Sequence, residues 1–253
     1  MPFKDHFSKQ ADQYTQFRPR YPHAWFEFLS GLTERRGLAW DCGTGNGQAA
    51  AGLAEFFDEV IATDASTSQI AHAQACSRVR YLVSSAEDCP LATASVDLVT
   101  VAQALHWFDR DRFYAQVRRV CRPGGVLAVW SYGLATVSAS VDRVVWRLYA
   151  EILGEHWPPE RRQVEQRYDT IAFPFGEIQP PRIEMTARWN LVDLIGYLGT
   201  WSSVARFNEV RGFDPLDLVR AELTAAWGAL ETVQTVTWPL NARVGRIDGS
   251  RPE

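Results

Sequence analysis

The chain has 253 residues, of which 46% are hydrophobic and 22% charged, which is typical of one large domain of a soluble globular protein. Its formal net charge of -4 gives no general attraction to phosphate backbones, so we expect no DNA partner. No stretch of about 18 uninterrupted apolar residues marks a membrane span, and the opening residues lack the apolar region of a signal peptide, so we expect a cytoplasmic protein with no membrane partner.

Residues 1–36 precede the first predicted strand. We expect them to form an N-terminal lid, in which a short helix is followed by an extended segment. The prolines of "RPRYP" (18–22) stiffen that segment, because a residue before proline is pushed away from helical geometry.

Between residues 37 and 131, short β-type runs alternate with helical stretches. A helix begins at Ser66, which forms a Ser-x-x-Gln cap with Gln69, and another ends at the turn Pro123-Gly124-Gly125. The predicted strands are residues 37–42, 59–64, 78–83, 95–102 and 124–131. The alternation predicts an α/β fold with a doubly wound, mostly parallel sheet, and residues 37–131 as the cofactor-binding core.

The rest of the chain is predicted to be mainly helical before it returns to the sheet. Residues 132–230 are expected to form an inserted helical cap that contains the substrate region, with one strand at 182–190. Residues 231–253 are expected to supply terminal strands, a hairpin or an edge strand, that complete the sheet before a frayed tail.

The segment "AWDCGTGNGQAA" (39–50) places three glycines behind Asp41 at the end of the first strand. Such a loop lets the backbone approach a nucleotide-like ligand, but the third glycine comes one residue early for the dinucleotide pattern. The Asp41 carboxylate would repel a pyrophosphate by roughly a few kcal/mol and attract a cationic, phosphate-free cofactor such as S-adenosylmethionine. Asp64, at the end of the second strand, fits the ribose of NAD or of S-adenosylmethionine equally.

These motifs together resemble the class I S-adenosylmethionine-dependent methyltransferases of type 11. "DCGTGNG" is similar to the first motif of that family. The segments that follow in the family's order are "TDAS" (63–66), "SSAEDCPL" (84–91), "VDLVTVAQALHWFD" (96–109) and "RVCRPGGVLAVW" (119–130). "FSKQADQYTQFRPRYP" and "HWFD" look closest to the branch of the trans-aconitate methyltransferases and related small-molecule enzymes. The resemblance covers roughly residues 5–131 and implies a Rossmann-like methyltransferase fold with a seven-stranded sheet.

The resemblance also implies a role for each matching position. The implied cofactor contacts are Asp41, Gly43, Gly45, Ala102 and Gln103 at the methionine end, Asp64 and Ala65 at the ribose, and Ser85, Ala86 and Glu87 at the adenine. Tyr14 and Arg18 lie on the lid that closes over the cofactor in such enzymes, and Arg18 would bind the cofactor's carboxylate. The four cysteines stand singly without histidines at ligand spacing, so we expect no metal site.

Structural explanations compete with some of these roles. Asp41 and Asp64 could cap the helices that follow them, and Ser85 and Glu87 could be turn residues. Arg18 could be a solvated surface charge. These alternatives stay open on the sequence alone.

The acceptor side has fewer markers. His106 follows the fourth strand at the rim where doubly wound sheets bind ligands, so it is the candidate catalytic base or substrate contact. Its neighbour Trp107 is a candidate substrate contact and equally suits packing. Tyr197, Trp201 and Ser202 could line a substrate pocket or belong to the core.

We expect an enzyme that transfers a methyl group in line from S-adenosylmethionine to a small molecule and leaves S-adenosylhomocysteine. A carboxylate or other oxygen acceptor is favoured, because a carboxylate needs no base and "AQALHW" lacks the Asn/Asp-Pro-Pro-Tyr of many nitrogen methyltransferases. The alternatives are a methyltransferase acting on RNA or protein, an NAD-dependent oxidoreductase and a non-enzymatic cofactor-binding protein. We expect a monomer or a homodimer.

Overall fold

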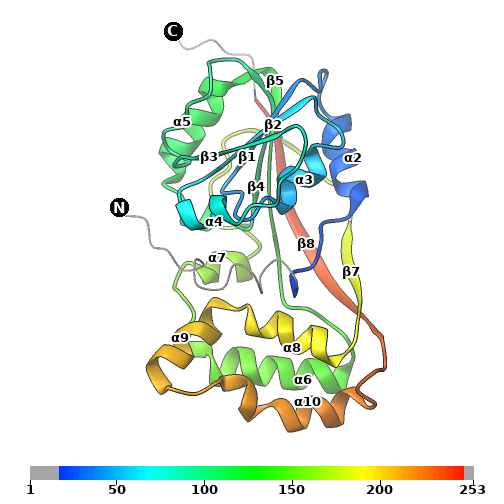
Figure 1. The fold of residues 1–253 in the computed structure, drawn as a ribbon. Helices are drawn as coiled ribbons and strands as arrows, with labels where there is room; N and C mark the ends of the chain where they lie inside the picture. Colours follow the sequence, from blue (N-terminus) through cyan, green and yellow to red (C-terminus); the bar gives the residue numbers. More distant parts are fainter. Residues whose placement is uncertain (1–16, 248–253) are drawn as a thin grey trace.

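The structure, a computed structural model, describes residues 17–247. Its centre is a mixed sheet in the order β3-β2-β1-β4-β5-β8-β6, with β7 paired to β8 outside this path (Figure 1). The strands are β1 Leu38–Cys42, β2 Glu59–Asp64, β3 Val79–Val83, β4 Val96–Ala102, β5 Cys121–Tyr132, β6 Gly176–Ile178, β7 Glu184–Trp189 and β8 Gln234–Arg246. β1 to β5 run parallel, whereas β8 runs antiparallel to both β5 and β6. The expected N-terminal helix and Tyr14 lie outside the described residues.

Helices cover both faces of this sheet. They are α2 His23–Gly31, α3 Gln48–Leu53, α4 Thr67–Ala71 and α5 Arg110–Val120. Trp25 of α2 and Leu53 of α3 are buried against one face, while Phe113 and Val117 of α5 are buried against the other. The predicted doubly wound α/β architecture is therefore confirmed. The predicted extended segment, residues 18–22, contains no helix or strand, and α2 begins directly after it, where apolar side chains follow at helical spacing.

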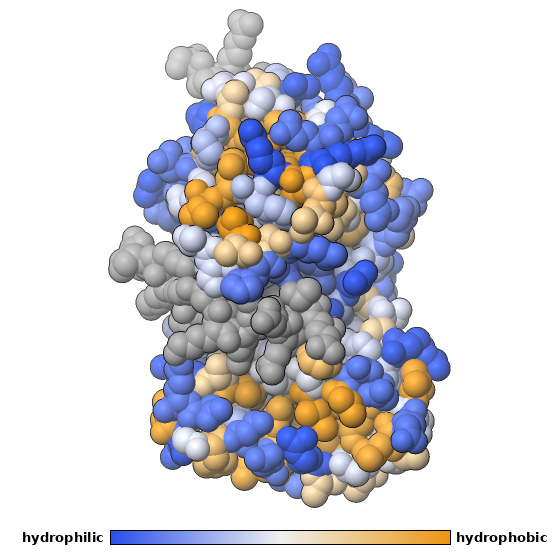
Figure 2. Space-filling model, viewed as in Figure 1, coloured by the Kyte–Doolittle hydropathy of each residue, from blue (hydrophilic) through white to orange (hydrophobic). Residues whose placement is uncertain are grey.

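A second layer of helices lies below the sheet in Figure 1. It consists of α6 Ala139–Trp146, a π-helical turn at Arg147–Ile152, α8 Leu191–Gly199, α9 Ser202–Arg211 and α10 Arg220–Trp227. These helices share one apolar core, which also takes in Tyr132 at the end of β5 and Trp238 of β8. Some large apolar side chains, Trp146 and Leu218 among them, remain exposed on this layer, whose surface is a mixture of apolar and polar residues in Figure 2. No helix within residues 17–247 is long and apolar enough to span a bilayer.

β8 joins the sheet to the helical layer. Residues 240–246 pair with β5, residues 234–239 pair with β7, and residues 244–246 also pair with β6. The hairpin or edge strand predicted here is wrong: the segment is one strand of 13 residues with neighbours on both sides. Pro239 is the last residue of the β7 ladder, opposite Glu184, so its missing N–H falls at a ladder end, just before the pairing passes to β5.

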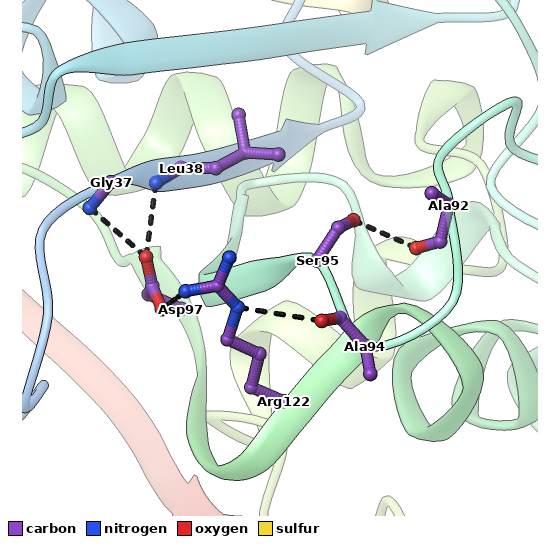
Figure 3. A network of polar contacts seen from close by, with 7 residues as sticks. All are labelled: Gly37, Leu38, Ala92, Ala94, Ser95, Asp97 and Arg122. Atoms are coloured by element: carbon purple, nitrogen blue, oxygen red, sulfur yellow. Dashed lines mark hydrogen bonds and ion pairs between the residues drawn. The ribbon is translucent and has the colours of Figure 1, made fainter.

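Asp97 at the start of β4 ties three segments together at the amino edge of the sheet (Figure 3). One carboxylate oxygen accepts hydrogen bonds from the backbone N–H groups of Gly37 and Leu38, both at 3.0 Å. The other accepts from Arg122, which forms an ion pair with it at 3.2 Å. Because Asp97 itself is buried, these bonds set the start of β1 against β4 and the entry to β5.

Replacing Asp97 with alanine is expected to destabilise the fold by about 2–4 kcal/mol, since two backbone donors and one guanidinium lose their acceptor. Urea unfolding followed by circular dichroism measures the change. Glu59→Ala is the control, because it removes an exposed carboxylate that pairs with Arg80 at 3.9 Å and should cost less than about 1 kcal/mol. Equal effects of the two substitutions would contradict the anchoring role.

Candidate active site

A cavity of about 430 Å³ opens where β1, β2, β3 and β4 end, at the edge where open α/β sheets bind ligands. This volume lies within the roughly 300–1,000 Å³ of small-molecule sites. The predicted site residues that line it are Gly43, Gly45, Asp64, Ala65, Ser85, Ala86, Glu87, Ala102, Gln103, His106 and Trp107. The other lining residues are Tyr21, Thr44, Asn46, Gln48, Ala49, Ser66, Gln69, Ser84, Ala104, Phe108 and Glu160. The sequence motifs at the ends of four separate strands therefore converge on one cavity.

The glycine loop has no room for side chains at two positions. Gly43 has a φ of +68°, and a Cβ there would lie 2.6 Å from the Cβ of Ala104. Gly47 has a φ of +90°, and its Cβ would lie 2.2 Å from the hydroxyl of Tyr81. The backbone N–H of Gly43 donates to the carbonyl of Thr63, which holds the loop on β2. The loop is thus a fixed backbone surface at the mouth of the cavity.

Asp64 braces this loop from the end of β2. One of its carboxylate oxygens accepts from the N–H of Gly45 and the other from the N–H of Ser66, both at 2.8 Å. The Ser66 hydroxyl accepts from the N–H of Gln69, as predicted for the start of α4. The return half of the predicted cap is made by Asp64 instead of the Gln69 side chain, because the Ser66 N–H is bonded to that carboxylate. Asp64 is thereby held in one orientation at the cavity wall.

Asp41 lies beneath the loop and does not line the cavity. Its side chain is 0% exposed, and its two carboxylate oxygens accept from the hydroxyls of Thr44 at 2.5 Å and Thr100 at 2.7 Å. Burial raises the pKa of Asp41 from 3.8 to about 6, although the two hydroxyl bonds act in the opposite direction. The structure therefore places Asp41 as a support for the loop, and its charge acts on the cavity only through the intervening atoms.

Gln103 follows β4 with a φ of +58°, a conformation in which a side chain other than glycine is strained. Its N–H donates to the carbonyl of Trp130 at 2.8 Å, and its side-chain amide donates to the carbonyl of Tyr132 at 3.3 Å. Two hydrogen bonds to β5 thus hold the turn that Ala102 begins. Strain of this kind concentrates at functional sites, where the surrounding structure maintains it.

His106 lines the cavity from the short helix Leu105–Trp107, and it is 9% exposed. Its Nδ1 lies 2.9 Å from the hydroxyl of Tyr168. Burial, together with the positive charge of Arg161, lowers the pKa of His106 to about 3. The imidazole is therefore neutral at physiological pH. A histidine of such low basicity does not suit the predicted role of a general base.

The remaining candidates lie away from the cavity. Arg18 donates to the hydroxyl of Tyr132 at 2.9 Å and to the carbonyl of Thr200 at 3.1 Å, and its guanidinium lies over the ring of Tyr197. Tyr197 and Trp201 are buried in the core of the helical layer, and Ser202 begins α9. None of these four residues is part of the cavity lining.

Residues that the sequence motifs did not single out also contribute to the site. Tyr21, Phe108 and Glu160 line the cavity, and Tyr168 contacts His106. Tyr21 and Phe108 lie within the quoted "RPRYP" and "HWFD", whereas Glu160 and Tyr168 come from the crossing segment, residues 158–181, which carries no such motif. Within residues 17–247, no cluster of acidic, histidine or cysteine side chains has the arrangement of a metal site.

The buried Asp41 predicts a pH dependence of stability. Because its pKa is raised in the folded state, the stability it contributes is fully present below the ordinary pKa near 3.8 and is lost as the pH rises through about 6. Between about pH 5 and about pH 7.5, the free energy of unfolding should fall by about 1.4 kcal/mol more in the wild type than in Asp41→Asn. Urea unfolding of both proteins at the two pH values measures this difference, and parallel changes would show that Asp41 titrates normally.

Known proteins with similar sequences identify the family. Residues 40–129 match the family model described as a methyltransferase domain. A solved protein from Anaeromyxobacter dehalogenans, described as a type II methyltransferase, is 50% identical with a TM-score of 0.87, covering 92% of this chain and 100% of that one. A protein of Dictyostelium discoideum named as a methyltransferase is 36% identical, over 89% of this chain and 87% of the relative. An uncharacterized methyltransferase of Mycobacterium tuberculosis is 34% identical, over 71% of this chain and 70% of the relative.

The site in this chain consists of the glycine loop, the acidic end of β2 and the strained turn after β4. The relatives that align with most of the chain are described as methyltransferases. The chain therefore belongs to the class I S-adenosylmethionine-dependent methyltransferases.

Proposed function

We propose that the cavity binds S-adenosylmethionine and that the enzyme methylates a small molecule at an oxygen atom, in the first place a carboxylate. The cofactor, when bound, supplies an electrophilic methyl group on a sulfonium. The observation that carries the acceptor class is that the positive charge of Arg161 acts on His106, a neutral residue that lines the cavity.

The cavity wall suits this cofactor in three respects. The Asp64 carboxylate, oriented by two backbone donors, would accept the ribose hydroxyls. The loop at Gly43 presents backbone without side chains. The Asp41 carboxylate beneath it keeps a negative potential under the loop at neutral pH, which favours a cation over a pyrophosphate. The further contacts would be Ala102 and Gln103 with the methionine end, Ala65 with the ribose, and Ser85, Ala86 and Glu87 with the adenine.

Arg161 is the cation next to the acceptor side. Its guanidinium lies 5.0 Å from the ring centre of Trp157 and 5.7 Å from that of Tyr149, whose hydroxyl accepts from its Nε at 3.2 Å. Among the ion pairs of residues 17–247, none includes Arg161. The preceding residue, Glu160, lines the cavity. The positive charge of Arg161 helps to lower the pKa of His106. A partly desolvated cation in this place favours an anionic acceptor.

A carboxylate acceptor also matches the chemistry that the chain offers. It is already ionised, so no proton has to leave before its oxygen takes the methyl group. Holding two reactants in line can lower a barrier by roughly 7–11 kcal/mol, whereas a general base contributes roughly 3–5 kcal/mol. Positioning by the cavity wall is therefore sufficient, and a weakly basic His106 is no obstacle.

Loss of the Asp64 carboxylate should weaken cofactor binding. Asp64→Ala is expected to raise the Kd for S-adenosylhomocysteine by at least about tenfold, because the ribose hydroxyls lose a charged acceptor. Isothermal titration calorimetry measures the Kd. Asp88→Ala, which removes an exposed carboxylate outside the cavity lining, should leave it within about twofold. An unchanged Kd in Asp64→Ala would contradict the ribose role, and tight NADH binding by the wild type would contradict the cofactor.

The acceptor class can be tested with labelled S-adenosylmethionine and a panel of carboxylates, phenols, amines, RNA and protein. We expect methylation of carboxylates, and we expect Arg161→Gln to raise the KM for the carboxylate about tenfold or more without changing the Kd for S-adenosylhomocysteine. The matched control is Arg162→Gln, which neutralises the exposed adjacent arginine. Preferential methylation of phenols, RNA or protein, or equal effects of the two substitutions, would contradict the proposal.

A further inference from the structure

His106 and Tyr168 form a buried polar pair at the acceptor side of the cavity. The two residues are 62 positions apart, and Tyr168 is 1% exposed. The phenol lies 2.9 Å from Nδ1 of His106 and contributes otherwise to the apolar core around α5. A phenylalanine would fill the same apolar space, so the hydroxyl calls for a separate explanation.

The backbone that carries Tyr168 is strained. Arg167 has a φ of +56° and Tyr168 a φ of +62°, two successive residues in the region that favours glycine. The turn is held from two sides: the Tyr168 N–H donates to the carbonyl of Gln163 at 2.9 Å, and the Arg243 guanidinium donates to the carbonyls of Tyr168 and Ile171. Strain maintained in this way delivers one side chain to one place, here the phenol to His106.

The pair permits only one sensible arrangement of protons. Burial raises the pKa of Tyr168 above its ordinary value, so the phenol keeps its hydrogen. Within residues 17–247, Nδ1 of His106 is the acceptor that lies beside that hydroxyl, because the backbone N–H of His106, which also lies against it, can only donate. If Nδ1 carried a hydrogen and donated it, the phenol hydrogen would be buried without an acceptor, which is costly. The phenol therefore donates, and Nδ1 accepts.

The other ring nitrogen then carries the imidazole hydrogen. No described residue forms a hydrogen bond with Nε2 of His106, and this atom is not fully buried. Since His106 lines the cavity, Nε2 is the atom that a ligand can reach. A neutral imidazole with this tautomer offers a ligand a hydrogen-bond donor and no lone pair.

We propose that Tyr168 is a positioning residue that locks His106 in the Nε2–H tautomer, so that His106 binds the methyl acceptor as a neutral donor instead of removing a proton from it. The part concerning the acceptor rests on the proposed function, whereas the tautomer is a property of the chain alone.

This arrangement suits an acceptor that is already anionic. One oxygen of a carboxylate would accept from Nε2–H, and the same group would supply the lone pair that forms the bond to the methyl carbon while the carbon–sulfur bond breaks and its electron pair stays on sulfur. No proton is released, so none has to be stored on the imidazole. Arg161 agrees with this, because its positive charge disfavours an imidazolium, whereas the Glu160 carboxylate on the cavity wall would repel an anion that came close to it.

Nitrogen NMR of the protein labelled with ¹⁵N-histidine tests the tautomer without any substrate. The chain has five histidines, and the His106 signals are assigned by their loss in His106→Gln. We expect wild-type His106 to show a protonated Nε2 and an unprotonated Nδ1 at neutral pH. In Tyr168→Phe the Nδ1 shift should move, and a second population with hydrogen on Nδ1 should appear. Hydrogen on Nδ1 in the wild type, or an unchanged spectrum in Tyr168→Phe, would overturn the proposal.

Tyr114→Phe is the matched control. Tyr114 is also buried, and its hydroxyl also bonds to the crossing segment, at the carbonyl of Ala172 at 2.9 Å, but it does not contact His106. Both substitutions should lower stability to a similar extent, and only Tyr168→Phe should alter the His106 spectrum. If Tyr114→Phe changed the His106 spectrum in the same way, the effect of Tyr168→Phe would reflect a general loss of stability. That outcome would overturn the positioning role of Tyr168.

Kinetics separate a donor from a base. With a carboxylate acceptor, His106→Gln should keep at least about tenfold more activity than His106→Ala, because the glutamine amide can donate from the place of Nε2. Tyr168→Phe should lower kcat while leaving the Kd for S-adenosylhomocysteine unchanged. Equal losses in the two His106 variants would overturn the donor role. If the wild type did not bind S-adenosylhomocysteine, that result would contradict the proposed function and would leave the tautomer result unaffected.

Discussion

The pairing of β8 with β5, β6 and β7 holds the two parts of the molecule in a fixed relation. The second half of β8, residues 240–246, continues the sheet beyond β5. The first half, residues 234–239, pairs with β7 and runs into the helical layer. One continuous backbone ladder therefore sets the position of the helical layer relative to the sheet. The crossing segment that supplies Glu160 and Tyr168 is positioned in the same way, since Arg243 of β8 bonds to it.

The electrostatics of the site are set by side chains that are themselves buried or shielded. Asp41 contributes its charge from under the glycine loop, while Asp64 presents an oriented carboxylate at the surface of the cavity. Arg161 acts on His106 from among aromatic rings. Asp41 and Asp64 thus contribute negative charge to the surroundings of the cavity and Arg161 contributes positive charge, while Glu87 and Glu160 also line it.

Local patterns predicted the parts of the fold that depend on local physics. The strands from β1 to β5, the start of α4 at Ser66 and the break after α5 follow from short-range periodicity and capping, and the structure has them close to the predicted bounds. The length of β8 was beyond such patterns, because Pro239 suggests a break until its place between two ladders is known. The position of Asp41 was beyond them too, since a motif gives the neighbours of a residue along the chain and not its depth. Tyr168 is the extreme case: its contact with His106 spans 62 positions and leaves no mark on the sequence around either residue.

The place of β8 in the chain also bears on how the protein can be made. The open edge of β5 faces no partner until residues 240–246 exist, and β6 and β7 pair with no other strand of residues 17–247. A nascent chain that has emerged only as far as α10 would therefore hold a five-stranded sheet whose β5 edge, like the β3 edge, has no partner strand. Exposed edges invite pairing with other chains. During synthesis, the β5 edge is therefore open to such pairing until β8 has emerged.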